Sequence, residues 1–301
     1  MNMKVDLCGV TLNNPVMTAS GTFGSGAEYA EFVDLNKLGA VVTKGVANVP
    51  WPGNPTPRVA EVYGGMLNAV GLQNPGIDLF VERDIPFLKQ FDTKIIVNVC
   101  GHSTEEYIEV VERLGDQPVD LLEINISCPN VKEGGIAFGQ DPKAVEAITK
   151  EMKKHAAQPV IMKLSPNVTD ITEMARAAEA GGADGLSLIN TITGMKIDIN
   201  RQKFVLANKT GGMSGPAIHP VAVRMVYQTA QAVRLPIVGM GGIMNAEDAI
   251  EMILAGATAV SVGTANFTNP HVTEEIVAGI RDYMERYQVA DIKDLVGAVH
   301  E

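Results

Sequence analysis

Short apolar runs recur along the whole chain, and each of them ends in polar or glycine residues. Runs that are apolar at successive positions suit parallel strands that are covered by helices on both faces. Most of these runs are followed by a helix-like pattern. The predicted strands number eight, and they cover residues 16–19, 40–43, 95–99, 121–124, 160–164, 185–189, 236–238 and 259–262.

The segments between these strands carry the start and stop signals of helices. Ser103-Thr104-Glu105-Glu106 has the pattern of a capping box. Asp141-Pro142, Asp170, Asn245 and Asn269-Pro270 open further predicted helices. Eight strands alternating with helices in 301 residues predict an α/β fold, a (β/α)8 TIM barrel, with a doubly wound sheet as the alternative.

Three connections from a strand to the next helix are much longer than is usual. They cover residues 45–76, 125–140 and 190–219, and in a barrel they lie on the carboxyl-terminal face, where active sites are found. Residues 4–7 and 10–12 predict a small hairpin at the N-terminal end of the sequence. No boundary or repeat interrupts the pattern, so we expect residues 1–301 to form a single domain.

Composition and charge narrow the kind of partner. The chain is 46% hydrophobic and 20% charged, as in globular proteins, and its net charge of −11 argues against nucleic acid or an anionic membrane as a partner. The three cysteines, Cys8, Cys100 and Cys128, are far apart and support neither a zinc site nor an iron–sulphur cluster. They indicate a reducing compartment and no signal-like segment is visible, so we expect a cytoplasmic protein.

Lys44 directly follows the apolar predicted strand 40–43, and Lys163 lies near the carboxyl end of the apolar predicted strand 160–164. A buried ammonium group is costly unless it meets an anion or a hydrogen-bond acceptor. A salt bridge to a neighbouring carboxylate is the alternative explanation for each lysine. Two such lysines at the functional ends of strands favour a bound ligand.

Two glycine segments follow the seventh and eighth predicted strands. Gly241-Gly242 and Gly263-Thr264 each precede a predicted helix, so their bare backbone N–H groups lie beside helix N-termini. This is the place where barrels of this kind commonly bind a phosphate group. A simple turn is the alternative for either segment taken alone.

Cys128 follows the fourth predicted strand in the polar turn Asn125-Ile126-Ser127-Cys128-Pro129-Asn130. Most lone cysteines are small buried hydrophobic residues, and we assign Cys8 and Cys100 to that class. A polar turn at a strand end favours chemistry for Cys128 instead, as either a base or a nucleophile.

Together these residues closely resemble class 1 dihydroorotate dehydrogenase, a flavin enzyme of pyrimidine biosynthesis, over nearly the whole chain. The resemblance is carried by Ala19-Ser20-Gly21-Thr22-Phe23, by residues 53–58 and 68–76, and by the turn at 125–130. It implies one FMN per chain at the carboxyl-terminal face of the barrel, with dihydroorotate stacked on the flavin ring. It implies no metal site.

The resemblance also implies which residues bind each group. The flavin would be lined by Ser20, Lys44, Gly45, Asn98, Asn125, Lys163 and Ile189, with its phosphate on Gly215, Gly241, Gly242, Gly263 and Thr264. The substrate would be held by Lys44, Asn68, Ala69, Val70, Gly71, Leu72, Asn125, Asn190 and Thr191. Several side-chain amides suit a ring that is rich in N–H and C=O groups.

The mechanism that the resemblance implies narrows the role of Cys128 to a general base. Cys128 would remove a proton from C5 of dihydroorotate while C6 passes a hydride to the flavin. Lys163 and Lys44 would stabilise the negative charge that develops. Residues 132–139 would act as a lid over the thiol, with Gly134-Gly135 as its flexible part.

The route of the electrons depends on the subclass. Gly64-Gly65-Met66 and residues 72–76 are most similar to class 1B, in which a homodimer of this subunit joins an electron-transfer subunit that carries FAD and a 2Fe–2S cluster. The resulting heterotetramer passes electrons to NAD. Class 1A, a homodimer that reduces fumarate, is the alternative. Class 2 enzymes use serine as the base and add a membrane segment, and this sequence shows neither.

Other classes of protein fit the sequence less well. A flavin tRNA-uridine reductase shares the barrel and a catalytic cysteine, but it needs a basic RNA-binding face. A flavin-free sugar-phosphate enzyme explains the glycine segments but not the lysines with the amides. A non-catalytic scaffold gives no reason for so many polar residues at strand ends.

Overall fold

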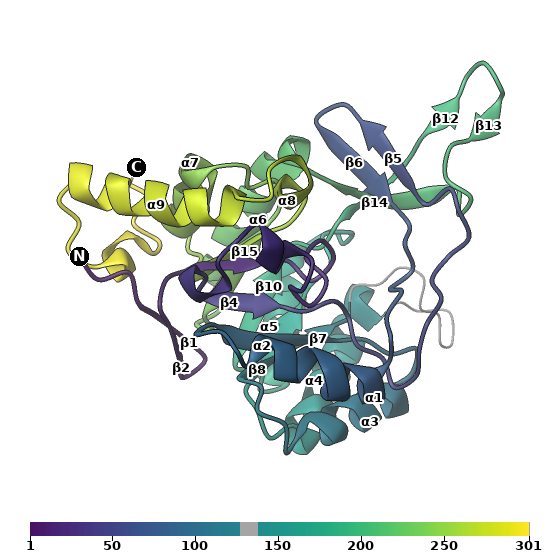
Figure 1. Ribbon diagram of the computed structural model, residues 1–301, viewed down its shortest axis with the longest axis horizontal. Coiled ribbons are helices and arrows are strands. Elements are labelled where there is room, and N and C mark those ends of the chain that lie inside the picture. Colours follow the sequence, from purple (N-terminus) through teal and green to yellow (C-terminus); the bar gives the residue numbers. More distant parts are fainter. Residues whose placement is uncertain (127–137, 301) are drawn as a thin grey trace.

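Parallel strands close into a barrel in the computed structural model, which describes residues 1–126 and 138–300 (Figure 1). Among these residues the barrel has eight strands in the order β10-β15-β16-β3-β4-β7-β8-β9. The (β/α)8 barrel is thereby confirmed, and the doubly wound sheet is excluded. The strands are β3 (Val16–Thr18), β4 (Ala40–Val42), β7 (Lys94–Val99), β8 (Leu121–Asn125), β9 (Val160–Lys163), β10 (Gly185–Leu188), β15 (Ile237–Met240) and β16 (Ala259–Val262).

Both faces of the barrel strands are buried, which explains why their sequences are apolar at successive positions. Every residue of β8, β9, β15 and β16 is buried. Each fully buried Leu or Ile contributes about 1.5–3 kcal/mol to stability. Between β3 and β4 the pairing is limited to Met17 and Ala40. There the Thr18 hydroxyl extends the contact, because it accepts a hydrogen bond from the Val42 backbone N–H at 3.0 Å.

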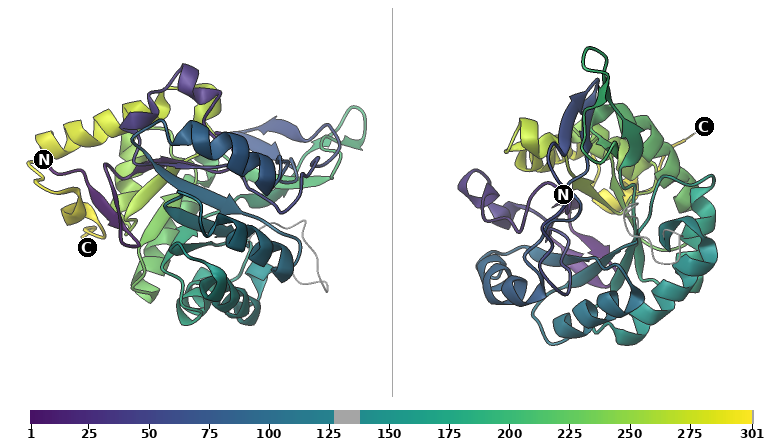
Figure 2. Two further views of the ribbon diagram at one scale, coloured as in Figure 1. Left: turned by 60° about the horizontal axis from the view of Figure 1, so that its bottom comes forward. Right: turned by 90° about the vertical axis from the view of Figure 1, so that its right-hand side faces the viewer.

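Helices form a ring around the strands, as the right-hand view of Figure 2 shows. Within the described residues, no helix is both long enough and apolar enough to cross a membrane. The α-helices are α1 (Ile77–Leu79), α2 (Ile85–Leu88), α3 (Thr104–Leu114), α4 (Pro142–His155), α5 (Ile171–Ala180), α6 (His219–Ala232), α7 (Ala246–Leu254), α8 (Ala265–Thr268) and α9 (Val272–Arg286). A π-helical turn (Phe80–Asp84) joins α1 to α2.

The predicted N-caps of four helices are formed by their side chains. Ser103, Asp141, Asp170 and Asn245 each accept a hydrogen bond from a backbone N–H in the first turn of the helix that follows. The capping box at α3 differs in one detail. The Glu106 carboxylate accepts from the backbone N–H of His102 at 2.6 Å, one residue before the cap.

Two connections differ from the predicted pattern. Between β3 and β4 the chain forms the short 3-10 turns Tyr29–Glu31 and Leu35–Lys37 instead of an α-helix. The last long helix begins at Val272, three residues after Asn269, because Asn269 and Pro270 lie in a turn between α8 and α9. The Asn269 side chain caps that turn by accepting from the His271 backbone N–H at 3.0 Å.

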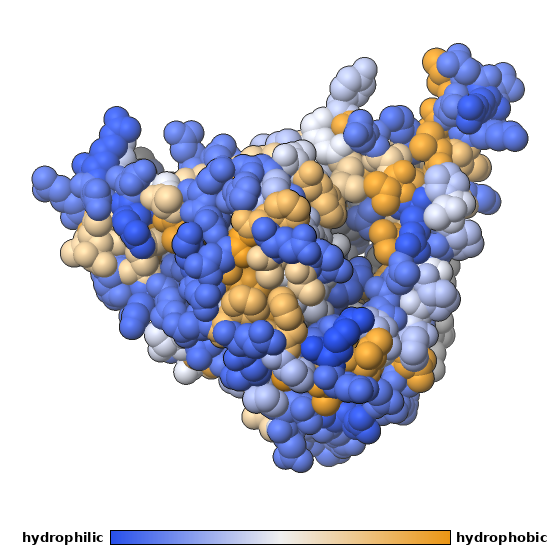
Figure 3. Space-filling view, viewed as in Figure 1, coloured by the Kyte–Doolittle hydropathy of each residue, from blue (hydrophilic) through white to orange (hydrophobic). Residues whose placement is uncertain are grey.

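A four-stranded antiparallel sheet projects from the carboxyl-terminal end of the barrel, at the upper right of Figure 1. It joins β5 (Val59–Val62) and β6 (Gly65–Asn68) from one long connection to β11 (Ile192–Met195) and β14 (Thr210–Ser214) from another. The small β12 (Ile197–Asp198) and β13 (Lys203–Phe204) pair extends it. Figure 3 shows apolar residues where these strands leave the barrel, and exposed Val59 and Met195 are among those on the sheet. The sequence predicted the long connections but not their pairing.

The predicted N-terminal hairpin is formed by β1 (Val5–Leu7) and β2 (Val10–Leu12), which pair antiparallel. Leu7 and Leu12 are fully buried. A Cβ added at Gly185, the first residue of β10, would lie 2.6 Å from Cys8 Sγ. The hairpin therefore packs against the amino-terminal ends of the barrel strands, away from the projecting sheet.

Burial is the main cause that raises the pKa of the Cys8 thiol from 9.0 to about 12, and the nearby carboxylates of Asp184 and Asp6 contribute to the same rise. Because the thiolate is the reactive form, we expect iodoacetamide to alkylate Cys8 at pH 8.5 at least about a hundredfold more slowly in the folded protein than in urea. The folded state retains this proton more strongly than the unfolded state. Its contribution to stability is therefore full below pH 9.0 and is lost as the pH rises toward 12.

Peptide mass spectrometry after timed alkylation measures the rate at Cys8. The variant Cys8→Ala is the control for the effect of pH on stability. Its free energy of unfolding should decrease less between pH 9 and 11 than that of the wild type, because it has no thiol to ionise. Equal alkylation rates in the folded and unfolded chain would contradict the predicted shift.

Candidate active site

A cavity of about 320 Å³ opens at the carboxyl-terminal end of the barrel, beneath the projecting sheet. Its walls come from the segments that follow β3, β4, β10, β15 and β16, from the ends of β8 and β9, and from β6 and β14. This is the face on which barrel enzymes carry their active sites. Its size lies within the range of small-molecule sites.

Most of the residues that the sequence singled out line this cavity. From the predicted flavin set they are Ser20, Lys44, Gly45, Asn125, Lys163, Ile189, Gly215, Gly241, Gly242, Gly263 and Thr264. From the predicted substrate set they are Lys44, Asn68, Ala69, Val70, Gly71, Leu72, Asn125, Asn190 and Thr191. These residues therefore lie around one cavity, and the group that each of them binds stays a prediction.

Asn98 lies behind the cavity wall and does not line it. Its side chain is fully buried, and its Oδ1 is 3.5 Å from Nδ2 of Asn125, which does line the cavity. Asn98 can therefore influence a bound molecule only through its neighbours, among them Asn125.

Cys128 and most of the predicted lid at 132–139 lie outside the described residues, which stop at Ile126 and resume at Phe138. Asn125, the last residue of β8, marks where the chain enters that segment. The Asn125 backbone carbonyl is held by the Tyr107 hydroxyl at 2.6 Å, so α3 fixes the end of β8.

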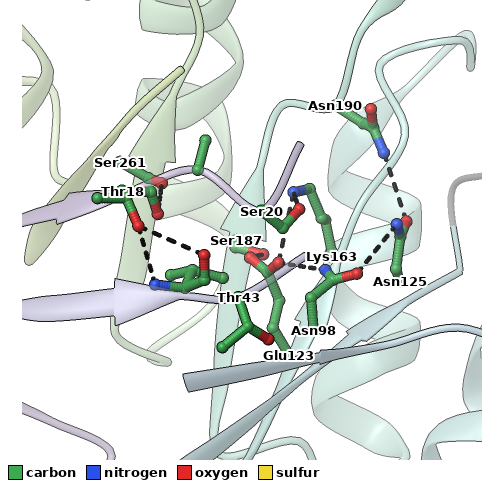
Figure 4. Close-up of polar contacts among 12 residues, drawn as sticks. Thr18, Ser20, Thr43, Asn98, Glu123, Asn125, Lys163, Ser187, Asn190 and Ser261 are labelled. Carbon is green, nitrogen blue, oxygen red and sulfur yellow. Dashed lines mark hydrogen bonds and ion pairs between the residues drawn. The ribbon is translucent and has the colours of Figure 1, made fainter. Parts of the chain in front are cut away.

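A buried polar network lies directly below the cavity, and Figure 4 shows its side chains. The Glu123 carboxylate accepts hydrogen bonds from Asn98 Nδ2 at 2.5 Å and from Ser187 Oγ at 2.8 Å. The Lys163 ammonium lies 3.4 Å from the same carboxylate and 3.2 Å from Ser20 Oγ. Lys163 thus has the salt bridge that was the alternative explanation for it, and it also lines the cavity. Its contact with a bound ligand stays a prediction.

Strand register explains why these groups meet. Asn98 on β7 lies opposite Glu123 on β8, and Ser187 on β10 lies opposite Lys163 on β9. Four adjacent strands therefore contribute one polar residue each at neighbouring levels of the barrel. Glu123 was not among the predicted site residues, although a carboxylate inside the apolar run 121–124 is the same kind of signal as the two lysines.

The loop at 68–72 is held at the cavity edge by the 53–58 motif. Asn54 donates from its backbone N–H to the Val70 carbonyl at 3.0 Å and from its side chain to the Ala69 carbonyl at 2.9 Å. Gly71 has a φ of +76°, and a Cβ there would collide with Asn54 at 2.7 Å. Arg58 donates to the side chain of Gln73 and so closes the contact between the two segments.

The predicted phosphate cradle is formed by backbone from three segments. Gly215, Gly241 and Gly242 have φ values of +109°, +129° and +70°. A Cβ at Gly242 would lie 2.8 Å from the Gly215 carbonyl oxygen and 2.8 Å from His219 Cβ, so only glycine fits there. His219, the first residue of α6, holds the loop from behind through Nδ1 and the Gly241 carbonyl at 2.8 Å. Thr264 Oγ1 bonds to Ser214 Oγ at 2.7 Å and joins the third segment.

Comparisons with known proteins point to one family. The family model of dihydroorotate dehydrogenase matches residues 2–284. A curated protein of Lachnoclostridium phytofermentans, named dihydroorotate dehydrogenase B (NAD(+)), catalytic subunit, is 72% identical over 299 residues, covering 99% of this chain and 100% of that protein. A protein of the same name from Alkaliphilus metalliredigens is 66% identical over 299 residues, which cover 99% of this chain and 99% of that protein.

A solved structure supports the fold. The crystal structure of DHODH from Eimeria tenella in complex with ferulenol superposes with a TM-score of 0.82. It covers 99% of this chain and 88% of that chain, at 23% sequence identity. Such distant similarity supports the barrel architecture alone.

Replacing Gly242 by Ala tests whether the cradle binds a phosphate group. The added Cβ meets the Gly215 carbonyl oxygen and must displace the backbone. We expect affinity for FMN to fall at least about tenfold, which corresponds to about 1.4 kcal/mol. Quenching of FMN fluorescence on binding measures it.

Gly182→Ala is the matched control. Gly182 also has a positive φ, of +89°, but it lies at the end of α5, and its nearest contact for a Cβ is Lys153 Cγ at 3.9 Å. Backbone strain at positive φ should cost each variant about 1–2 kcal/mol of stability. Gly242→Ala should lose more than Gly182→Ala, because its Cβ also collides with the Gly215 carbonyl oxygen. An unchanged FMN affinity in Gly242→Ala would show that this glycine segment does not bind the phosphate of FMN.

Proposed function

The chain belongs to the dihydroorotate dehydrogenase family, and we propose that it is the catalytic subunit of an NAD-linked, class 1B enzyme of pyrimidine biosynthesis. Its reaction is the oxidation of dihydroorotate to orotate. The observation that carries this proposal is 72% identity, over 99% of the chain, to a relative that bears this name. The cavity supports it, since strand-end lysines, amides and a glycine cradle converge there.

The described residues fit FMN as the cofactor, one per chain. At Gly215, Gly241 and Gly242 an added Cβ would collide with neighbouring parts of the chain, so only glycine lets these segments pack closely and offer backbone N–H groups to a phosphate. Ile189, fully buried Ser261 and the Lys163 ammonium lie farther along the same cavity. When bound, FMN supplies the two-electron acceptor for the hydride that leaves C6 of the substrate.

Amide side chains and one loop would hold the substrate. Asn68, Asn125 and Asn190 line the cavity on the side of the projecting sheet and of β8 and β10. Their amides both donate and accept, which matches a dioxopyrimidine ring with alternating N–H and C=O groups. Lys44 and the backbone of the 68–72 loop would bind its carboxylate. The contact of Asn54 with this loop keeps it in place.

The proton of the reaction would go to Cys128. Dihydroorotate loses a hydride from C6 and a proton from C5, and the electron pair of the C5–H bond forms the C5=C6 double bond of orotate. The thiolate of Cys128 accepts that proton. In the sequence, Cys128 follows by three positions Asn125, the last residue of β8 and one of the residues proposed to bind the ring.

Lys163 and Lys44 would provide the positive charge of the site. Lys163 is almost fully buried, and a charge acts strongly where little water screens it. Its ammonium would stabilise negative charge that develops on the flavin ring, while Lys44, which is less buried, would act nearer the substrate.

The electrons would leave through a second subunit. The sequence has three cysteines in all, too few for a four-cysteine cluster, and no dinucleotide-binding fingerprint. The name catalytic subunit, borne by the relatives, fits such a division. We place FAD and a 2Fe–2S cluster on that partner, with two copies of each subunit in a cytoplasmic heterotetramer. Within it, residues 1–301 act as one FMN-binding domain.

The variant Cys128→Ala tests the general base. We expect it to retain its yellow flavin but to lose at least about a hundredfold in turnover at neutral pH, the lower range of general base catalysis. Flavin content from the absorbance spectrum and turnover with dihydroorotate are the two measurements. The control is Cys100→Ala, since Cys100 is a buried residue outside the cavity lining and should retain turnover. Near-normal turnover in Cys128→Ala would exclude this thiol as the base.

Assays with different acceptors test the subclass. The purified chain alone should reduce fumarate at a negligible rate. Co-expression with an FAD- and iron-containing subunit should give NAD-dependent turnover, and both subunits should co-purify in equal amounts. Rapid fumarate reduction by this chain without a partner would assign it to class 1A.

A further inference from the structure

Glu123 is a buried carboxylate that the proposed reaction does not use. It is 2% exposed and lies in the middle of β8, below the cavity floor. Its three partners, Asn98, Ser187 and Lys163, come from the three strands β7, β10 and β9. Figure 4 shows all of them directed toward the carboxylate.

A contribution to stability alone does not explain this arrangement. A buried ion pair loses much of its Coulomb energy to desolvation, and an apolar pair of similar volume is often equally stable. The Glu123 carboxylate is, however, one contact away from the cavity, because its partner Lys163 lines the cavity and also bonds to Ser20 there. In a site with little water, that negative charge offsets part of the lysine charge that a bound ligand experiences.

Glu123 also fixes the direction of a chain of amides. An ionised carboxylate can only accept hydrogen bonds, so Asn98 must turn its NH2 group toward Glu123 and its oxygen toward Asn125. Asn125 then presents Nδ2 to Asn98 and accepts from Asn190 Nδ2 through its own Oδ1, at 3.4 Å. Asn190 in turn accepts from the Thr191 backbone N–H at 2.7 Å. Asn125 and Asn190 line the cavity, so their donor and acceptor atoms are set from below.

We propose that Glu123 is a positioning residue: its carboxylate holds the Lys163 ammonium at the cavity floor, limits the positive charge there and orients the Asn98–Asn125–Asn190 chain. This rests on the proposed FMN site. Glu123 thereby keeps the midpoint potential of the bound flavin lower than Lys163 alone would set it. Reduction adds negative charge to the ring, and an unbalanced ammonium would favour the reduced form.

Glu123→Gln removes the charge and keeps the shape. We expect the equilibrium for two-electron reduction of the flavin to shift at least about tenfold toward the reduced form, a rise of about 30 mV in midpoint potential. Reductive titration against a reference dye measures it. A glutamine can also donate, so the amides are free to reverse, and orotate should bind at least about tenfold more weakly. Glu123→Asp keeps the charge and should stay within tenfold of the wild type in the reduction equilibrium.

Ser187→Ala provides a second test that leaves the carboxylate in place. It removes a hydroxyl that donates to Glu123, so the negative charge becomes less balanced, and the potential should move in the opposite direction, to a more negative value. Opposite signs in the two variants would not result from loosened packing. If Glu123→Gln does not fold or does not retain flavin, Ser187→Ala alone tests the proposal. A more negative flavin potential in that variant supports it, and an unchanged or more positive potential contradicts it.

The outcomes separate this inference from the proposed function. Wild-type protein that binds no FMN would overturn both. Wild-type protein that binds FMN and oxidises dihydroorotate, while the potential is the same in Glu123→Gln, would overturn only the role of Glu123. If Glu123→Gln and Glu123→Asp shift the potential equally, the charge is not the cause, and the proposal also fails.

Discussion

Closure of the parallel barrel is the constraint on which the rest of the molecule depends. Because the eight barrel strands of the described chain run in one direction, their carboxyl ends meet at one rim. Residues that are far apart in the sequence, such as Ser20, Asn125 and Gly263, thereby line a single cavity. The backbone hydrogen bonds of the strands set the positions of the side chains that emerge at their ends.

Closure also governs what can be buried near the rim. The pairing of neighbouring strands places Asn98 opposite Glu123 and Ser187 opposite Lys163, so every polar group in this layer finds a partner from the next strand. A single charged residue at this depth would be strongly destabilising, and removing one member of a buried pair costs about 3–5 kcal/mol. The polar layer is therefore a property of four strands together.

Much of this was predictable from the sequence, and the part that was not has a physical reason. Continuous apolar runs and helix caps such as Asp170 depend on local chemistry, so the strands and most helix starts were predicted well. The start of the last helix was placed too early, because Asn269 caps a turn that resembles a helix start. The pairing of β6 with β14 depends on contacts between distant segments, which no local pattern reveals.

The same distinction applies to the site. Strand-end polar residues such as Lys44 and Asn190 follow from the predicted strands, and the structure places them in one cavity. Glu123 was missed because it was counted as part of an apolar run, and its importance appears only when its neighbours are known. The position of Asn98 behind Asn125 likewise depends on barrel geometry. The predicted role of Cys128 rests on its sequence neighbours and on the family.

The projecting sheet above the cavity has a consequence for the order in which the protein folds. Its central contact pairs residues 66–68 of β6 with residues 212–214 of β14, across a very long separation in sequence. Closing such a loop in an unfolded chain is entropically unfavourable, so we expect the barrel strands between them to form first and to bring the two ends together. During synthesis, β6 would leave the ribosome long before its partner exists. We therefore expect the ligand cavity to be among the last parts of the molecule to be completed.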